Sequence, residues 1–156
     1  MSKEDKNTRA ITVNRKAYHD YEILSKHEAG LVLLGTEVKA IREGRVNLKD
    51  SHVEIRRGEA FLVGCHIGPY SNAGLNNHEN ERPRKLLLHL RELRKFDQRV
   101  TVKGVTIVPL RMYFNPRGRV KLEVGLVKGR RSYDKKQKIK DRDIKREVDR
   151  ELKRYQ

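Results

Sequence analysis

The chain has 156 residues, a formal net charge of +16 and a pI near 10.2, which fits one domain with an appendage rather than two domains. This charge points to a polyanion, most commonly nucleic acid, and leaves an anionic membrane surface as the second choice. The single cysteine excludes an internal disulfide, and no apolar run reaches the ~20 residues of a membrane span. Together with an N-terminus that lacks an apolar signal region, these features predict a cytoplasmic protein.

The first half of the chain predicts two strand pairs joined by a helix. After a flexible charged arm over residues 1–9, residues 10–13 are typical of a short strand, and residues 21–24 and 31–34 are expected to form a hairpin. Thr36 is the expected N-cap of a short helix that ends before Gly44. Alternating apolar residues then predict a second hairpin, with its turn at Arg57 and Gly58.

The second half begins with a long polar loop over residues 68–83, and loops of this length are usually functional or disordered. Apolar residues at helical spacing from Leu86 to Val100 predict an amphipathic helix. A third hairpin is expected from the alternation over residues 108–114 and 120–126, with Lys121 and Glu123 on its outward face.

Three hairpins with inserted helices predict a mainly β fold, a small antiparallel Greek-key barrel of about six strands with two or three helices, similar to the oligonucleotide-binding barrels. A half-open sheet capped by two helices is the alternative. The barrel domain is expected over residues 10–131, followed by a basic tail over residues 132–156.

The C-terminal segment is basic and poor in apolar residues. From Lys128 onward it has thirteen basic and six acidic residues, a net charge of +7. Such a segment is expected to be disordered alone. Ile144, Val148, Leu152 and Tyr155 nevertheless form one narrow helical stripe, which predicts a helix that orders against a partner. The alternative is a solvated basic extension without a specific role.

No set of residues predicts catalysis or metal binding. The six histidines and Cys65 lack the paired spacings of zinc sites, and Cys65 is expected to be a buried core residue. Asp50, Ser51 and His52 are neighbours on an expected strand, so their side chains cannot converge on one point. The sequence therefore favours a binding protein with no cofactor and no metal.

Recognition of RNA would use cations for phosphates and exposed aromatic or apolar groups for unpaired bases. Near the N-terminus, Arg15 and Lys16 supply cations and His19 and Tyr21 supply rings, although Tyr21 is equally compatible with a core position. Leu87, flanked by cations, is a candidate apolar contact, or it packs under the long loop. Glu28 and Glu37 are either acceptors for base amino groups or ordinary solvated acids. The candidates from the residues themselves are Arg15, Lys16, His19, Tyr21, Glu28, Glu37, Arg84, Lys85 and Leu87.

Five segments, residues 14–21, 28–39, 58–62, 84–89 and 125–129, closely resemble the SsrA-binding protein (SmpB) family, and the match runs in order from about residue 10 to the chain end. The resemblance implies an oligonucleotide-binding-type barrel that binds the tRNA-like end of transfer-messenger RNA (tmRNA). It further implies delivery of alanyl-tmRNA, escorted by elongation factor Tu, to stalled ribosomes for trans-translation. The family's RNA-contact positions correspond to Asn14, His19, Glu28, Leu87 and Lys121.

The same resemblance implies that the tail occupies the decoding centre and the empty message channel, against the 16S rRNA of the small subunit. Lys136 stands where the family has arginine, which keeps the charge and loses the planar fork. The protein is expected to act as a monomer. The tail candidates are Lys128, Arg130, Arg131, Tyr133, Asp134, Lys135, Lys136, Lys138 and Ile144.

Two other functions stay open. One is a generic barrel that binds single-stranded RNA or DNA, which differs by having no preference for a folded tRNA-like RNA. The other is an RNA-processing enzyme, which the absence of a convergent acid, histidine or metal set disfavours.

Overall fold

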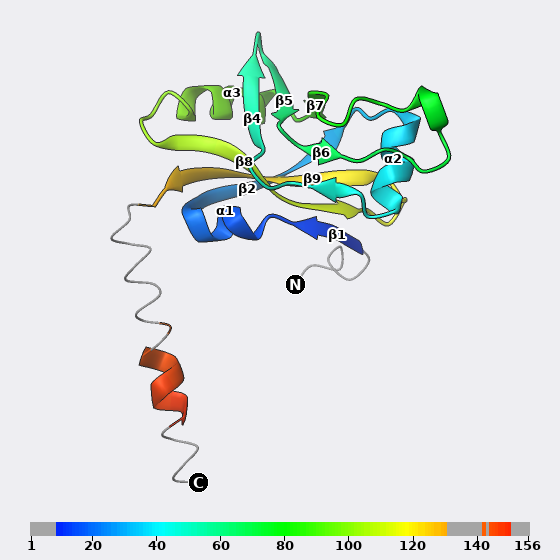
Figure 1. Ribbon diagram of the computed structural model, residues 1–156. Helices are drawn as coiled ribbons and strands as arrows, with labels where there is room; N and C mark the ends of the chain where they lie inside the picture. The colour runs from blue at the N-terminus through cyan, green and yellow to red at the C-terminus, as the bar shows by residue number, and fades with distance from the viewer. Residues whose placement is uncertain (1–8, 131–141, 143, 151–156) are drawn as a thin grey trace.

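The structure is a computed structural model that describes residues 9–130, 142 and 144–150. A seven-stranded antiparallel sheet forms the body, in the order β1-β8-β9-β2-β7-β5-β4 (Figure 1). Its strands are β1 (Arg9–Val13), β2 (Tyr21–Leu31), β4 (His52–Arg56), β5 (Glu59–Val63), β7 (Arg84–Leu87), β8 (Val105–Phe114) and β9 (Val120–Gly129). A second, two-stranded sheet pairs β3 (Val46–Asn47) with β6 (His66–Ile67). The expected mainly β, antiparallel fold is confirmed, with seven strands in the main sheet.

The sheet curls because its edge strand β4 packs back against β8. α1 (Arg15–Asp20) packs against β8 and β2, and α3 (Leu90–Arg99) packs against β4 and β8. α2 (Gly35–Arg42) lies at the opposite end of the sheet from the point where β9 leaves the body (Figure 1). The long polar loop contains one short 3-10 turn, Gly74–Asn76. Helices therefore cover parts of the sheet and leave the remainder of its outer face open.

The main core lies inside the curled sheet and follows the alternation of the strands. Met112, Leu122 and Val124 point inward from β8 and β9 and are fully buried, as is Phe96 from α3. Cys65 also belongs to this core, and burial raises the pKa of its thiol to about 11. The expected core position of Cys65 is thus confirmed.

The expected hairpin over residues 21–34 is wrong, because β2 is one continuous strand from Tyr21 to Leu31. Residues 25–30 contain polar side chains that the sequence analysis took for a turn. The inward-facing member His27 is satisfied by Ser25 and Glu92, each 2.9 Å from one of its ring nitrogens. Gly30 does not form a turn. Its missing side chain leaves room for Leu87, its partner on the neighbouring strand β7.

The expected helix beginning at Leu86 is also wrong at its start. Residues 84–87 form β7, which is hydrogen-bonded to β2 on one side and to β5 on the other. Arg84 and Leu86 are buried while Leu87 is exposed, so the local period is two. α3 begins only at Leu90. The helical spacing of Leu86 and Leu90 was misleading, because Leu86 belongs to a strand and Leu90 to the helix that follows it.

Several local predictions are confirmed. The second hairpin is β4–β5, with positive φ at Arg57 (51°) and Gly58 (75°), as tight two-residue turns require. The third is β8–β9. The predicted helix is α2, although its N-cap is Leu34, and Thr36 instead contacts Nδ1 of His78 at 3.0 Å. Helix α1 was not predicted.

The described part of the C-terminal segment is helical at residue 142 and over residues 144–150. Ile144 and Val148, 59% and 49% exposed, lie in the segment where the apolar stripe predicted a helix. Figure 1 shows this helix apart from the sheet. Leu152 and Tyr155 lie outside the described residues. Among described residues, no helix is long and apolar enough to span a membrane.

Candidate nucleic-acid interface

The outer face of β2, β8 and β9 has two parts. At one end, α1 covers a small apolar cluster made by Ala17, Val108, Leu110 and Val127. Towards the other end, alternation brings charged and polar side chains to the same outer face, namely Lys26, Glu28, Arg111, Tyr113, Lys121 and Glu123. We call these six residues the polar array.

The side chain of Glu28 on β2 is positioned by the hydroxyl group of Tyr113 on β8. The ring of Tyr113 is buried, and its hydroxyl donates a hydrogen bond to Oε2 of the exposed Glu28. Burial and this bond to a carboxylate both raise the pKa of Tyr113. The hydroxyl therefore remains protonated and holds the Glu28 carboxylate in place.

Cations stabilise the second acid of the polar array. Glu123 lies directly opposite Glu28 in the β2–β9 register. Its carboxylate is 3.4 Å from Nε of Arg111 and 3.9 Å from Nζ of Lys26. The Arg111 guanidinium also lies 4.6 Å from the centre of the Tyr113 ring. The two neighbouring carboxylates are thus tolerated, because two cations offset the charge of Glu123 and the Tyr113 hydroxyl donates a hydrogen bond to Glu28.

Leu87, Gly30 and Lys121 meet where β7, β2 and β9 lie side by side. A Cβ at Gly30 would be 3.3 Å from Cβ of Leu87 and 3.7 Å from Nζ of Lys121. Leu87 is 54% exposed, so it does not pack under the long loop. A hollow of about 330 Å³ opens beside these three residues. The structure therefore joins Glu28, Leu87 and Lys121, which are far apart in sequence, on one surface.

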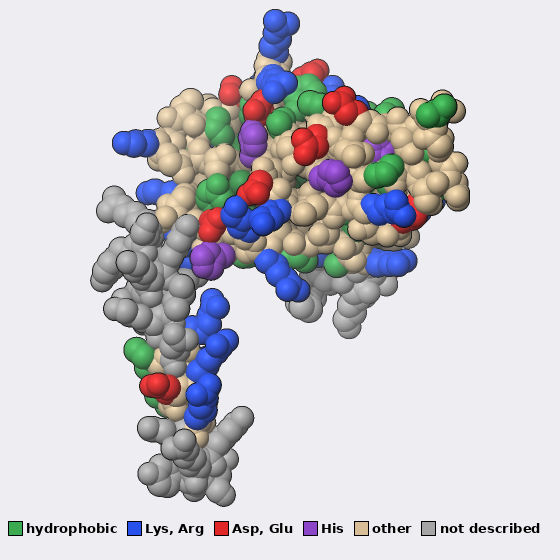
Figure 2. Space-filling model, viewed as in Figure 1, with side chains coloured by type: hydrophobic (Ala, Val, Ile, Leu, Met, Phe, Trp, Pro, Cys, Tyr) green, Lys and Arg blue, Asp and Glu red, His purple; other side chains and the backbone are tan. Residues whose placement is uncertain are grey.

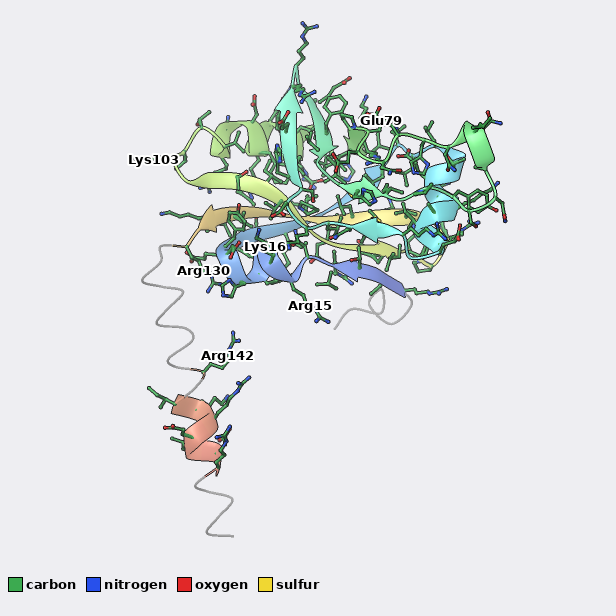
Figure 3. The ribbon with its side chains drawn as sticks, viewed as in Figure 1. Arg15, Lys16, Glu79, Lys103, Arg130 and Arg142 are labelled. Atoms are coloured by element: carbon green, nitrogen blue, oxygen red, sulfur yellow. The ribbon has the colours of Figure 1, made fainter. Side chains whose placement is uncertain are left out.

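The α1 candidates form a second group at the other end of β2. Arg15 is exposed and points away from the sheet, and Lys16 bridges to Asp50 at 2.6 Å (Figure 3). His19 is half-exposed, with Nδ1 2.9 Å from Asp20. Tyr21 is half-buried and packs on the apolar cluster under α1. Arg15, Lys16 and His19 are therefore accessible to a ligand. The ring of Tyr21 instead packs against the cluster that holds α1 on the sheet.

Asn14, which the family resemblance assigns to RNA contact, has a structural role in this fold. It is 6% exposed, and its Nδ2 donates to the carbonyl oxygens of Pro109 (2.8 Å) and Leu48 (3.3 Å). Its Oδ1 accepts from the backbone N–H of Ala17 and caps α1. Asn14 fixes the position of α1 and thereby that of His19.

Glu37 and Arg84, two further candidates for RNA contact, have fully buried side chains. Nε of Arg84 donates to Glu37 at 2.6 Å, and Arg82 donates to the same carboxylate at 2.5 Å. Burial opposes the charge of Glu37, but hydrogen bonds from Arg82, the backbone of Leu34 and Arg84 outweigh it and lower its pKa. Arg84 also donates to the Cys65 carbonyl, so the pair ties α2 and the long loop to the sheet. Lys85, the neighbouring candidate, is partly exposed and bridges to Glu59 at 3.2 Å.

The tail candidates are only partly described. Lys128 is exposed at the end of β9, and the backbone N–H of Arg130 donates to the carbonyl of Asp20 at 3.0 Å. Arg130 thus lies at the α1 end of the sheet, near Lys16 (Figure 3). Ile144 is exposed on the C-terminal helix, where Figure 2 shows cations along one side and hydrophobic groups on the other. Arg131, Tyr133, Asp134, Lys135, Lys136 and Lys138 lie outside the described residues.

Tyr113, Arg111 and Lys26 were not among the candidates expected from the sequence. The signal was present, because alternation of Met112 and Phe114 into the core places Arg111 and Tyr113 on the outer face. In the described residues, no group of three or more histidine, cysteine, aspartate or glutamate side chains is placed to hold a metal ion.

Comparison with known proteins places this chain in a family. Residues 11–154 match the family described as SmpB protein. The chain belongs to the SmpB family. An SsrA-binding protein of Syntrophobacter fumaroxidans is 54% identical over 147 residues, covering 94% of this chain and 91% of the relative. One of Solidesulfovibrio magneticus is 47% identical and covers 99% of this chain and 100% of the relative.

A solved structure described as "tmRNA-SmpB: a journey to the center of the bacterial ribosome" has the same fold as this SmpB-family chain. Its TM-score is 0.66 at 45% sequence identity, covering 78% of this chain and 85% of that one. The barrel expected from the resemblance is therefore the fold of the SmpB family.

Proposed function

We propose that this protein binds the tRNA-like domain of tmRNA and delivers it to stalled ribosomes for trans-translation in the cytoplasm, as a monomer. The observation that carries the proposal is the surface joining Glu28, Leu87 and Lys121, in a chain whose relatives are SsrA-binding proteins. Elongation factor Tu takes part indirectly, through the alanyl-tmRNA that it escorts. No cofactor and no enzymatic step is included in the proposal.

The extent of the surface supports a folded RNA as the ligand. β2 runs from Tyr21, beside α1, to the Gly30 region, and the nine residue-to-residue steps between Tyr21 and Gly30 span roughly 30 Å. His19 and Lys16 lie near one end of this span, and Leu87 and Lys121 lie near the other. A single nucleotide covers only a fraction of this length, whereas two arms of a compact RNA can contact both ends. The direct contacts in this proposal are Arg15, Lys16, His19, Glu28, Lys85, Leu87 and Lys121.

The C-terminal segment, residues 132–156, has the second role in this proposal. Arg142, Arg146 and Arg150 recur every four residues, so they share one side of a helix. The side chains of Ile144 and Val148 are exposed. Cations and a thin apolar stripe suit an RNA-lined channel, because its phosphates neutralise the cations and its walls give the segment a surface on which to order. The residues that this proposal places along the decoding centre and the message channel are Lys128, Arg130, Arg131, Tyr133, Asp134, Lys135, Lys136, Lys138 and Ile144.

The experiment compares the full chain with a form ending at Arg131. Binding is measured at physiological salt to the tRNA-like domain of tmRNA and to an unstructured RNA of equal length. Both forms are expected to prefer the folded RNA, and only the full chain is expected to support peptidyl transfer to alanyl-tmRNA on a stalled ribosome. Equal binding of both RNAs, lost with the tail, would show a generic single-strand binder instead.

A further inference from the structure

A second hollow, outside the polar array, lies where β1 begins and β8 turns into β9. It has a volume of about 410 Å³ and is lined by Arg9, Arg42, Phe114, Asn115, Pro116 and Gly118. Arg9 and Phe114 are directly opposite in the β1–β8 register, so their side chains share one face. Arg42 is the last residue of α2 and lines the same hollow. Three separate elements thus bring two arginines and one aromatic residue to a single hollow.

The electrostatics of this hollow favour an anion. Arg9 and Arg42 are both exposed, and within residues 9–130 neither has a carboxylate within ion-pair distance. Among the described residues, no acidic side chain lines the hollow. Other arginines of the barrel, such as Arg56 and Arg111, are paired with Glu54 and Glu123. The cations of this hollow therefore have unused capacity for phosphate.

Phe114 supplies an apolar surface between these cations. It is half-buried, and it packs against the main core while also lining the hollow. The turn beneath it is rigid: Oδ1 of Asn115 accepts from the backbone N–H groups of Arg117 (3.1 Å) and Arg119 (2.8 Å). Gly118 completes the turn at φ 76°. The ring and its surroundings are thus held in place before any ligand arrives.

The hollow is continuous with the surface already described. Gly118 lines both this hollow and the one beside Leu87 and Lys121, which also contains Arg119. Arg9, Arg42, Arg119 and Lys121 therefore form a strip of cations around the β8–β9 turn, and the part of the chain that the structure describes places no acid in the lining of either hollow. An RNA strand held at Leu87 and Lys121 can follow this strip without meeting a carboxylate there.

We propose that the Arg9–Arg42–Phe114 hollow binds an unpaired nucleotide of the RNA, with its phosphate between the two guanidinium groups and its base against the Phe114 ring. Proteins bind unpaired RNA with cations that contact its sugar-phosphate backbone and with aromatic rings that stack on its bases. The proposal rests on the RNA-binding function proposed above and extends its interface beyond the polar array, to the end of the barrel formed by α2 and the β8–β9 turn.

The first test replaces both cations in the full chain, as Arg9→Gln with Arg42→Gln, and measures binding to the tRNA-like domain over a salt series. Affinity is expected to fall about tenfold or more, and the slope of log affinity against log salt to decrease by about one to two, because two phosphate contacts are lost. The matched control is Arg91→Gln with Lys95→Gln on exposed positions of α3. It removes the same charge and is expected to have a much smaller effect.

The second test uses the absence of tryptophan from the chain. Phe114→Trp places a single tryptophan in the hollow, where a stacked base is expected to quench its emission when the tRNA-like domain binds. The quenching should require higher RNA concentrations in the Arg9→Gln, Arg42→Gln background. Thermal unfolding of each variant without RNA shows that the barrel is intact.

The outcomes separate this proposal from the function on which it rests. If the double arginine variant binds like its α3 control, or Phe114→Trp emission is unchanged at saturating RNA, the hollow is not a nucleotide site. A Glu28→Gln variant measured in parallel still reports on the polar array. If the unaltered chain does not prefer the tRNA-like domain over unstructured RNA, the proposed function itself fails.

Discussion

The hydroxyl of Tyr113 donates a hydrogen bond to the carboxylate of Glu28, although the two residues are 85 positions apart. Tyr113 is 3% exposed and Glu28 is exposed, so a buried ring positions a surface acid. A carboxylate fixed in this way can accept hydrogen bonds from base amino groups without first losing side-chain freedom. In the proposed interface, Tyr113 is therefore a positioning residue for Glu28.

Tyr113→Phe is expected to lower the affinity for the tRNA-like domain by about fivefold, equivalent to the ~1 kcal/mol of one hydrogen bond. Glu28→Gln should cost at least as much. Because Tyr113 acts through Glu28, the double variant should bind no more weakly than Glu28→Gln alone. Equilibrium binding of the four proteins completes the cycle, and additive losses would show that Tyr113 contacts RNA independently.

Leu87→Ala is expected to weaken RNA binding by about tenfold, since burying a leucine side chain on binding contributes roughly 1.5–3 kcal/mol. Leu90→Ala is the matched control, because Leu90 is 61% exposed and lies on α3. Neither substitution should change the melting temperature by more than a few degrees, because neither side chain is buried. Equal effects of the two substitutions on affinity would contradict a specific contact at Leu87.

Glu37→Gln is expected to destabilise the barrel by about 3–5 kcal/mol at neutral pH, because it leaves the buried Arg84 without its anion. The hydrogen bonds of Glu37 hold its pKa below the usual 4.5 despite burial. Its ionised form therefore stabilises the fold above pH 4.5, and this contribution is lost as pH falls through the lower folded pKa. The difference between variant and unaltered chain should shrink on acidification.

Urea unfolding from neutral to acidic pH measures this difference, with the exposed Glu22→Gln as a control that should change little. RNA binding separates support from contact. Under conditions where Glu37→Gln is folded, its affinity should match that of the unaltered chain. A specific loss of affinity in the folded variant would restore Glu37 as a direct contact.

Gly125→Ala is expected to destabilise the protein by about 1–3 kcal/mol, because the new Cβ would lie 2.8 Å from Cδ1 of the buried Leu110. Gly129→Ala on the same strand is the control, since nothing lies within 4 Å of a Cβ there. The free energy of unfolding from chemical denaturation decides between them. A small loss at Gly125 would mean that the apolar cluster beneath α1 can shift to accept a methyl group.

The sequence alone determined those features that depend on local chemistry. Arg57 and Gly58 specify a tight turn, alternation specifies β8 and β9, and the charge of the whole chain specifies a polyanionic partner. These signals come from backbone conformation, side-chain period and net charge, which neighbouring residues or composition set without reference to the rest of the fold.

Tertiary structure decided the features that depend on distant partners. β7 is a strand because β2 and β5 hydrogen-bond to both of its sides, which overrides a helical spacing between Leu86 and Leu90. Glu37 and Arg84 look like surface charges in the sequence and are buried because each supplies the other's counter-ion. Strand pairing brings Tyr113 to Glu28, and strand pairing together with the position of α2 places Arg9, Arg42 and Phe114 around one hollow. Sequence separation conceals such contacts, because curling of the sheet brings together residues that no local pattern connects.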